Sequence, residues 1–145
     1  MSTQVQIASR PALHVAIQVL QDAKLPTEDL TESHVEHFFY AGSPAKPTGL
    51  VGLEIFGEVA LLRSLAVVPE RRGFGEGLQL FAHAEREAWA KGVRAIFLLT
   101  TTAEDFFSKY GYARASRDTA PAAIRSTKEF AGICPASSAF MAKQL

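Results

Sequence analysis

Three glycines alternate with other residues at positions 73, 75 and 77, in the run Arg72-Gly73-Phe74-Gly75-Glu76-Gly77. An apolar run at 59–68 precedes them, and a helical pattern follows at 78–91. The first-turn amides of a helix have no partner within the helix, and the helix dipole adds partial positive charge there. Glycines let a ligand approach the backbone and let the chain adopt positive φ. This order of strand, glycine turn and helix therefore predicts a site for a pyrophosphate or a similar polyanion.

The glycine spacing distinguishes three kinds of phosphate loop. A nucleotide P-loop needs a Gly-Lys pair followed by Ser or Thr, and the chain has none. A dinucleotide fingerprint needs a further glycine at the position of Leu78. The third pattern, Arg or Gln followed by x-x-Gly-x-Gly, fits Arg72, Gly75 and Gly77. It is the acyl-CoA pyrophosphate loop of the GCN5-related N-acetyltransferases (GNAT), and segments 63–70, 98–102 and 105–112 also resemble that family.

The resemblance implies a mixed α/β fold with a central, mostly antiparallel sheet and flanking helices. One parallel pair of strands, ending near Val68 and Thr100, should splay apart and admit acetyl-CoA between them. The resemblance implies that acetyl-CoA contacts the side chain of Phe107 and the backbone of three strand residues, Leu65, Ala66 and Val67. It also implies contacts with the six residues of the loop: Arg72, Gly73, Phe74, Gly75, Glu76 and Gly77.

Two of these positions depart from the family pattern. Glu76 stands where members usually carry an aliphatic residue under the loop, and a carboxylate there should turn to solvent or pair with Arg71. Phe107 stands where many members carry a tyrosine that is proposed to protonate the leaving thiolate. Losing a general acid slows such a reaction without abolishing it.

Acetyl transfer needs a donor that polarises the thioester carbonyl, and a proton acceptor. The backbone amide of Leu65 or Val67 is the candidate donor. Glu54 is the candidate base, since a half-buried carboxylate has a raised pKa. The alternative for Glu54 is a strand residue that faces solvent.

An amino-acid acceptor also needs a cation for its acid group. Arg63 is conspicuous in an apolar strand, where it either meets the substrate or pairs with Glu54. Arg125 is a second candidate, with a solvated helix arginine as its alternative. Thr101, in a threonine triplet after the next strand, is the third candidate for substrate binding.

The acceptor itself stays open between several hypotheses. The run Leu62–Val67 and the threonine triplet are similar to the amino-acid acetyltransferase branch, including glutamate N-acetyltransferases. Segment 120–127, with Cys134-Pro135, is similar to small arsenic-resistance acetyltransferases, which act on arsenic- or phosphorus-containing amino acids. A non-catalytic CoA-binding module is the alternative from another class, and Glu76 and Phe107 are the residues that favour it.

Composition bounds the remaining possibilities. The 145 residues suit a single domain, 1–145, and 48% of them are hydrophobic. Fifteen basic and fifteen acidic residues argue against nucleic-acid or membrane partners and for a small molecule. A single cysteine, Cys134, and the lack of a leader or a membrane span predict a cytoplasmic protein.

Two further expectations concern assembly and metals. The resemblance to the GNAT family allows a homodimer. His34 and His37 are expected on opposite faces of a strand, so no metal site is predicted.

Hydrophobic periodicity predicts the elements that must position these residues. Strands are expected at 5–8, 35–40, 50–56, 59–68, 93–100, 112–117 and 138–143, and helices at 11–20, 27–30, 78–91, 102–110 and 121–130. Thr102 is expected to cap the fourth of these helices.

Overall fold

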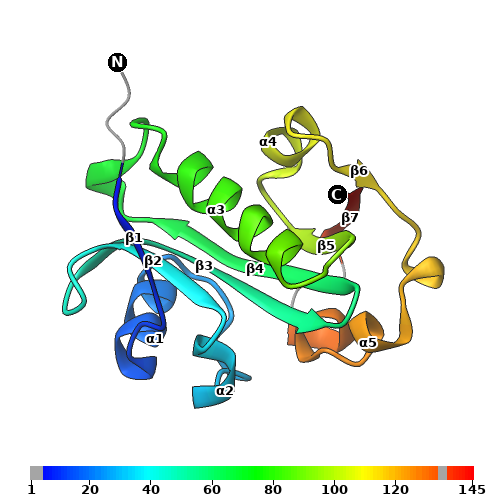
Figure 1. Ribbon diagram of the computed structural model, residues 1–145, viewed down its shortest axis with the longest axis horizontal. Coiled ribbons are helices and arrows are strands. Elements are labelled where there is room, and N and C mark those ends of the chain that lie inside the picture. Colours follow the sequence, from blue (N-terminus) through cyan, green and yellow to red (C-terminus); the bar gives the residue numbers. More distant parts are fainter. Residues whose placement is uncertain (1–4, 134–136) are drawn as a thin grey trace.

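The computed structural model describes residues 5–133 and 137–145, and its centre is one seven-stranded sheet. The strand order is β1-β2-β3-β4-β5-β7-β6, and each neighbouring pair is antiparallel except β4–β5. The predicted mixed sheet with one parallel pair is confirmed (Figure 1). The strands are β1 (Ile7–Ser9), β2 (Phe38–Gly42), β3 (Pro47–Phe56), β4 (Val59–Val67), β5 (Ala95–Thr100), β6 (Ala113–Arg114) and β7 (Ala139–Gln144).

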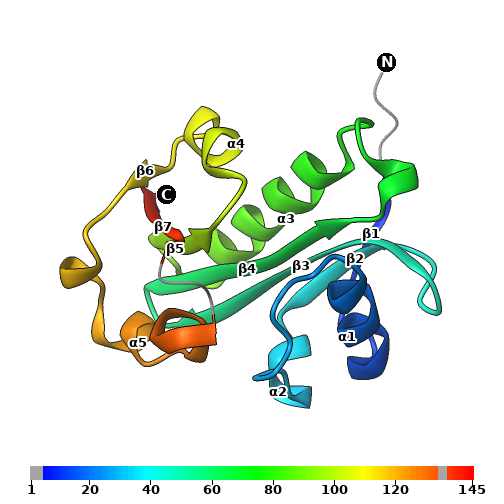
Figure 2. The same cartoon turned by 180° about the vertical axis from the view of Figure 1, so that it is seen from behind.

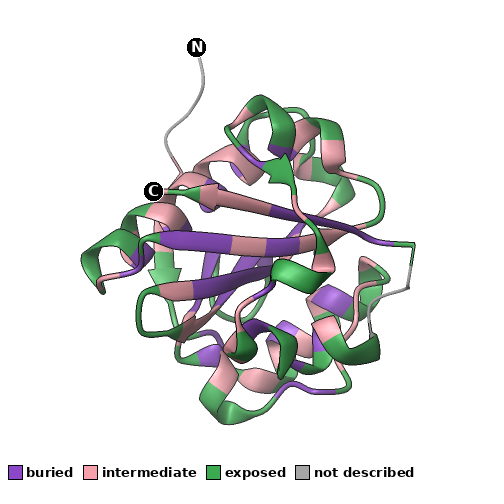
Figure 3. Cartoon of the chain, turned by 90° about the vertical axis from the view of Figure 1, so that its right-hand side faces the viewer, coloured by how far each residue is buried: buried purple, intermediate pink, exposed green. Residues whose placement is uncertain are grey.

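Helices cover both faces of this sheet. The longest, α3 (Glu76–Ala90), lies across one face, and α1 (Leu13–Asp22) and α2 (Glu32–Val35) lie on the other (Figures 1 and 2). α4 (Glu104–Lys109) follows β5, and α5 (Ala122–Arg125) precedes a π-helical segment, Glu129–Ile133. The strands between these layers are largely buried (Figure 3), and ten apolar residues of β2, β3, β4 and α3 form much of the core: Phe39, Ala41, Val51, Leu53, Ala60, Leu62, Leu80, Phe81, Ala84 and Ala88.

Several predicted boundaries are wrong, chiefly in the N-terminal half. The helix expected at 27–30 lies instead at Glu32–Val35, so His34 is helical and His37 precedes β2. β3 begins at Pro47 because this segment, expected to be a loop, pairs with Gly42. The helix α4 begins after Ala103 rather than Thr102, and Thr100 Oγ1 accepts the Ala103 amide at 3.0 Å.

The parallel pair β4–β5 separates partway along its length. Its register ends at Leu61 and Phe97. Just beyond, Ser64 and Leu65 together oppose one residue of β3, and Ser64 has a φ of 62°. Such a bulge bends and twists its strand. The second half of β4 therefore leaves β5, as the resemblance implied, and its edge toward β5 is open.

Alternation along β4 fixes which groups face this open edge. The Val68 amide donates to Thr48 O at 2.9 Å, so Val68 faces β3. Successive residues of a strand direct their backbone groups to opposite sides. Val67 and Leu65 therefore face away from β3, toward the gap between β4 and β5. The contact of Arg72 Nε with Val67 O, at 3.0 Å, lies on the same side.

Candidate active site

A cleft of about 440 Å³ occupies the gap between β4 and β5. Three segments and two separate residues line it: Leu62–Leu65 of β4, Leu98–Ala103 from β5 onward, Lys24–Pro26 with Glu28 before α2, and Phe107 and Ser138. Of the residues singled out in the sequence, the cleft brings together Arg63, Leu65, Thr101 and Phe107. It also recruits Lys24 and Glu28, which no sequence pattern indicated.

The glycine loop lies at the end of β4 and leads into α3. Gly73 has a φ of 86°, and Gly75, the residue that caps α3, has a φ of 80°. Nothing lies within 4 Å of the position that a Cβ would take at either glycine, so conformation rather than crowding requires glycine here. No side chain caps the helix. Its first-turn amides therefore stay available to an anion.

The side chains of the loop divide between its surface and its underside. Phe74 is 60% exposed, and the Arg71 guanidinium lies 5.2 Å from its ring centroid. Glu76 is only 3% exposed, and its Oε1 lies 3.6 Å from Arg71 Nε. Its Oε2 faces Gly49 and has no hydrogen-bond partner among the described residues. Of the two predicted outcomes for Glu76, pairing with Arg71 is therefore the one observed.

Phe107 forms part of an aromatic cluster at the β5 side of the cleft. Its ring packs edge-on against Phe81 and Phe106, and it is 5% exposed. Tyr112 also packs on Phe107 and donates its hydroxyl hydrogen to Glu85 at 2.9 Å. Burial, together with the charge of Glu85, raises the pKa of Tyr112. The side chain at 107 therefore contributes shape to the cleft and no proton.

Arg63 lies at the centre of a buried ion-pair cluster, which we call the Arg63 cluster. The side chain is 0% exposed. Nη1 donates to Asp29 at 2.5 Å and to Glu54 at 2.9 Å, and Nη2 donates to Asp29 at 2.9 Å. Glu129 Oε1 lies 3.2 Å from Nη2. The pairing of Arg63 with Glu54, one of the two predicted alternatives, is therefore observed, and it includes two further carboxylates.

Burial and charge act against each other in the Arg63 cluster. Burial would raise the pKa of Asp29, but the hydrogen bonds and charge of Arg63 outweigh it and lower that pKa. Burial would lower the pKa of Arg63, but the surrounding carboxylates outweigh it and raise that pKa. For Glu129, burial prevails over the attraction of Arg63 and raises the pKa to about 7. The cluster therefore holds a permanent cation among carboxylates of unequal acidity.

The candidate base and the second candidate cation lie away from the cleft. Glu54 lines a separate cavity of about 290 Å³, together with Asp29 and His34. Its carboxylate is bound by Arg63 and is 12% exposed, so the solvent-facing alternative is wrong, while the role of a base stays a prediction. Arg125 donates to the backbone carbonyls of Ala120 and Asp118. It is not among the described residues that line the cleft.

Sequence reasoning missed the residues that come from distant segments. Lys24, Glu28 and Ser138 reach the cleft from connections between elements, and no periodic pattern marks such positions. The single cysteine, Cys134, lies outside the described residues. Within residues 5–133 and 137–145, no helix has the length and apolarity needed to cross a bilayer.

Comparison with known proteins gives a consistent family assignment. Residues 34–114 match the acetyltransferase (GNAT) domain family. An amino-acid acetyltransferase from Ralstonia nicotianae is 40% identical over 63 residues, which are 43% of this chain and 14% of that protein. An uncharacterized N-acetyltransferase from Chlorobaculum tepidum is 31% identical over 102 residues, 70% of this chain and 64% of that protein.

Solved structures share the fold over nearly the whole chain. N-acetylglutamate synthase from Neisseria gonorrhoeae, complexed with coenzyme A and N-acetyl-glutamate, gives a TM-score of 0.81 at 22% identity, covering 100% of this chain and 36% of that one. A Mycobacterium tuberculosis protein solved in complex with CoA gives 0.76 at 19% identity, covering 97% and 99%. The chain thus spans a minor part of the amino-acid acetyltransferases that it matches.

Proposed function

Because the chain belongs to the GNAT acetyltransferase family, we propose that it transfers the acetyl group of acetyl-CoA to the amine of a small amino acid. The observation that carries this proposal is the separation of β4 from β5 beyond Leu61 and Phe97, on the half of β4 that leads to the glycine loop. The separation leaves an open strand edge, and the start of α3 follows it with first-turn amides that no side chain caps. Acetyl-CoA, an extended molecule with a pyrophosphate in its middle, fits this succession of strand edge and helix start.

Different residues of the chain bind different parts of acetyl-CoA in this proposal. The loop amides around Gly73 and Gly75 donate hydrogen bonds to the pyrophosphate. Arg72 and Arg71 lie beside the loop as cations, the first on Val67 O and the second between Phe74 and Glu76. The open edge at Leu65–Val67 offers amides and carbonyls to the pantetheine arm, whose groups bond like those of a peptide strand.

Direct attack of the amine on the thioester needs few groups in the cleft. The Leu65 amide, which faces the gap, donates to the carbonyl oxygen as negative charge develops on it. Glu28 is the carboxylate among the described residues of the cleft lining. It takes the place of Glu54 as the proposed proton acceptor, acting directly or through water. Coenzyme A leaves as the thiolate and takes a proton from solvent, since Phe107 has none to give.

The acid group of the acceptor also needs a partner. Arg63 is buried and surrounded by carboxylates, and Arg125 donates to the backbone carbonyls of Ala120 and Asp118. Lys24 lines the same cleft as the threonine triplet that includes Thr101. We therefore assign the acid group of the amino acid to Lys24 and the threonine hydroxyls. This position accepts a carboxylate, and equally the phosphinate or arsonate of an analogue.

The experiment that tests the reaction compares amino acids with matched hydroxy acids, in which a hydroxyl replaces the α-amine. The protein is incubated with acetyl-CoA and either a mixture of amino acids or the matched mixture of hydroxy acids, and the products are identified by mass spectrometry. We expect one acetyl group on the α-amine of an amino acid and none on the hydroxy acids. Glu28→Gln should lower kcat more than it changes KM, whereas Glu54→Gln should act through stability. Binding of acetyl-CoA without any acetylated product would refute the proposal and favour a non-catalytic module.

A further inference from the structure

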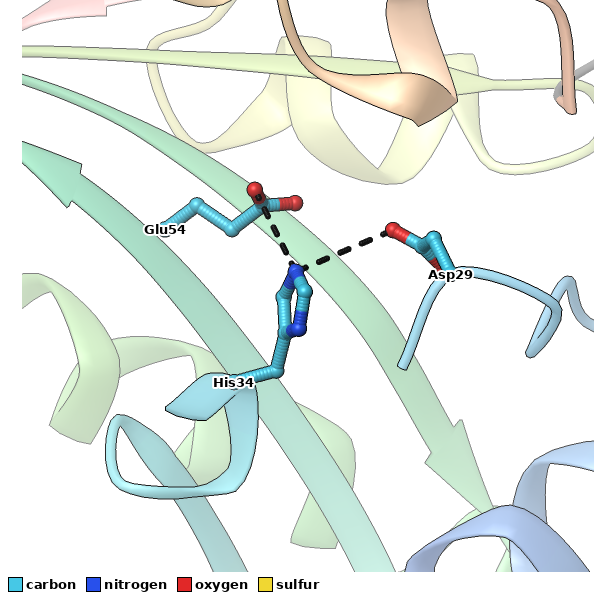
Figure 4. A group of neighbouring side chains, drawn as sticks. All are labelled: Asp29, His34 and Glu54. Carbon is cyan, nitrogen blue, oxygen red and sulfur yellow. Dashed lines mark ion pairs between the residues drawn. The ribbon is translucent and has the colours of Figure 1, made fainter. Parts of the chain in front are cut away.

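Three potential metal ligands converge beside the Arg63 cluster, outside the cleft. His34 Nε2 lies 3.7 Å from Glu54 Oε1 and 3.9 Å from Asp29 Oδ2 (Figure 4). The three ligand atoms all lie within 4.8 Å of one another. They come from three separate elements, namely α2, β3 and the connection before α2. The sequence prediction of no metal site assumed that His34 lay in a strand, and that assumption is wrong.

The charges at this position are unbalanced. Arg63 supplies one positive charge to three carboxylates, Asp29, Glu54 and Glu129. Its Nη1 occupies Glu54 Oε2, which leaves Oε1 of the same carboxylate directed at His34. An ionised carboxylate has lone pairs for several partners. With Asp29 and Glu54 ionised, a divalent cation would offset negative charge that Arg63 alone does not.

The imidazole ring is already oriented for coordination through Nε2. The Thr31 amide donates to Nδ1 at 3.2 Å, and Nδ1 lies 2.9 Å from Thr31 Oγ1. Zinc on Nε2 needs the ring hydrogen on Nδ1, where Thr31 Oγ1 can accept it in place of the contact with the amide. Such a hydrogen bond on the far nitrogen is the usual support of a metal-binding histidine. Thr31 therefore holds the His34 ring in place from behind.

The spacing and the adjacent space match zinc. Ligand atoms of a tetrahedral zinc at about 2.0 to 2.2 Å from the metal lie roughly 3.3 to 3.6 Å apart. The two contacts of His34, at 3.7 and 3.9 Å, need a contraction of a few tenths of an ångström, and the Asp29–Glu54 pair, within 4.8 Å, needs up to about 1 Å. The cavity of about 290 Å³ opens over the three residues and has room for a water as the fourth ligand. A histidine nitrogen with two carboxylates suits zinc better than magnesium or calcium.

We propose that Asp29, His34 and Glu54 form a zinc site that ties the connection between α1 and α2 to β3. The same connection supplies Lys24 and Glu28 to the cleft. Zinc at this position therefore holds in place the connection that carries Lys24 and Glu28, the residues assigned to the acceptor, while the metal itself lies outside the cleft. The site does not depend on the acceptor, and it is testable apart from the acetyltransferase activity.

The test measures zinc binding to chelator-treated protein by calorimetry, with His34→Gln and His37→Gln as matched variants. His37 lies three residues further on and is not one of the three ligands. We expect one zinc per chain in the wild type and in His37→Gln, and an affinity at least tenfold lower in His34→Gln. Thr31→Val should give an intermediate loss.

Cobalt provides a second readout that needs no variant. Co²⁺ in a tetrahedral nitrogen and oxygen site should give visible absorption bands, which added zinc removes. Equal affinities in the wild type and His34→Gln, or an equal loss in His37→Gln, would overturn the proposal. So would cobalt spectra of the hexaaqua ion in the presence of the folded wild type.

Discussion

Glu129 should make the stability of this protein fall as the pH rises. Its pKa is about 7 in the folded protein and 4.5 for an ordinary glutamate, because burial disfavours the charged form. Between these values the folded protein keeps a proton that the unfolded chain has released. The stabilisation is complete below the lower value and is lost as the pH rises through the upper one. The pKa difference corresponds to about 3 kcal/mol, since each unit is worth about 1.36 kcal/mol.

The assay is urea unfolding of the wild type and Glu129→Gln from about pH 5 to about pH 8, with a chelator present. Glutamine keeps the shape and is neutral throughout, so contributions of other groups cancel in the difference. The stability of the wild type relative to the variant should fall by about 2.5 kcal/mol over this range. Glu70→Gln, at an exposed acid just before the loop, is the control and should show no such change. Parallel pH profiles for the wild type and Glu129→Gln would refute the reasoning.

Three further predictions concern the loop, the Arg63 cluster and the aromatic side of the cleft. Gly75→Ala should lose about 1–2 kcal/mol of stability, because alanine is strained at a φ of 80°, and calorimetry should show at least tenfold weaker binding of acetyl-CoA. Gly57→Ala is the control: its φ is 68° in a distant turn, so it should lose stability and keep its affinity for acetyl-CoA. Arg63→Met should lose about 3–5 kcal/mol in denaturant unfolding because it leaves buried carboxylates unpaired, whereas Arg114→Met, on an exposed pair, should leave the unfolding midpoint almost unchanged. Tyr112→Phe should lose about 1 kcal/mol with the hydrogen bond to Glu85, and an unchanged melting temperature would contradict that bond.

Local patterns predicted the parts of the fold that local interactions determine. The glycine loop, β4 and α3 lie where the sequence placed them, within about two residues, because positive φ and a helix start leave clear residue signatures. The bulge at Ser64 was not predicted, since a serine at a φ of 62° has no such signature. The order of elements followed from hydrophobic periodicity, and the parallel pair followed from the strand–helix–strand order at the centre of the chain. The separation of that pair was implied by the family resemblance.

The Arg63 cluster shows why the rest of the site could not be predicted. An arginine in an apolar strand needs a buried partner, and that argument identified Glu54, which lies on the neighbouring strand. Asp29 and Glu129 belong to segments distant in sequence, and tertiary packing alone brings them to Arg63. His34 was assigned to a strand because its helix is only one turn long. The sequence therefore showed that Arg63 needs a buried partner, but it did not show which side chains from distant segments lie next to it.

The most direct test of the central claim is acetyl-CoA-dependent thiol release with a panel of amines. The panel contains glutamate, other amino acids, phosphinic and arsonic amino acids, polyamines and a lysine peptide. The account predicts turnover confined to amino acids and their acidic analogues, lost in Gly75→Asp and reduced in affinity for the acceptor in Lys24→Ala. Turnover of polyamines or of the lysine peptide alone, or turnover that Gly75→Asp leaves intact, would contradict it.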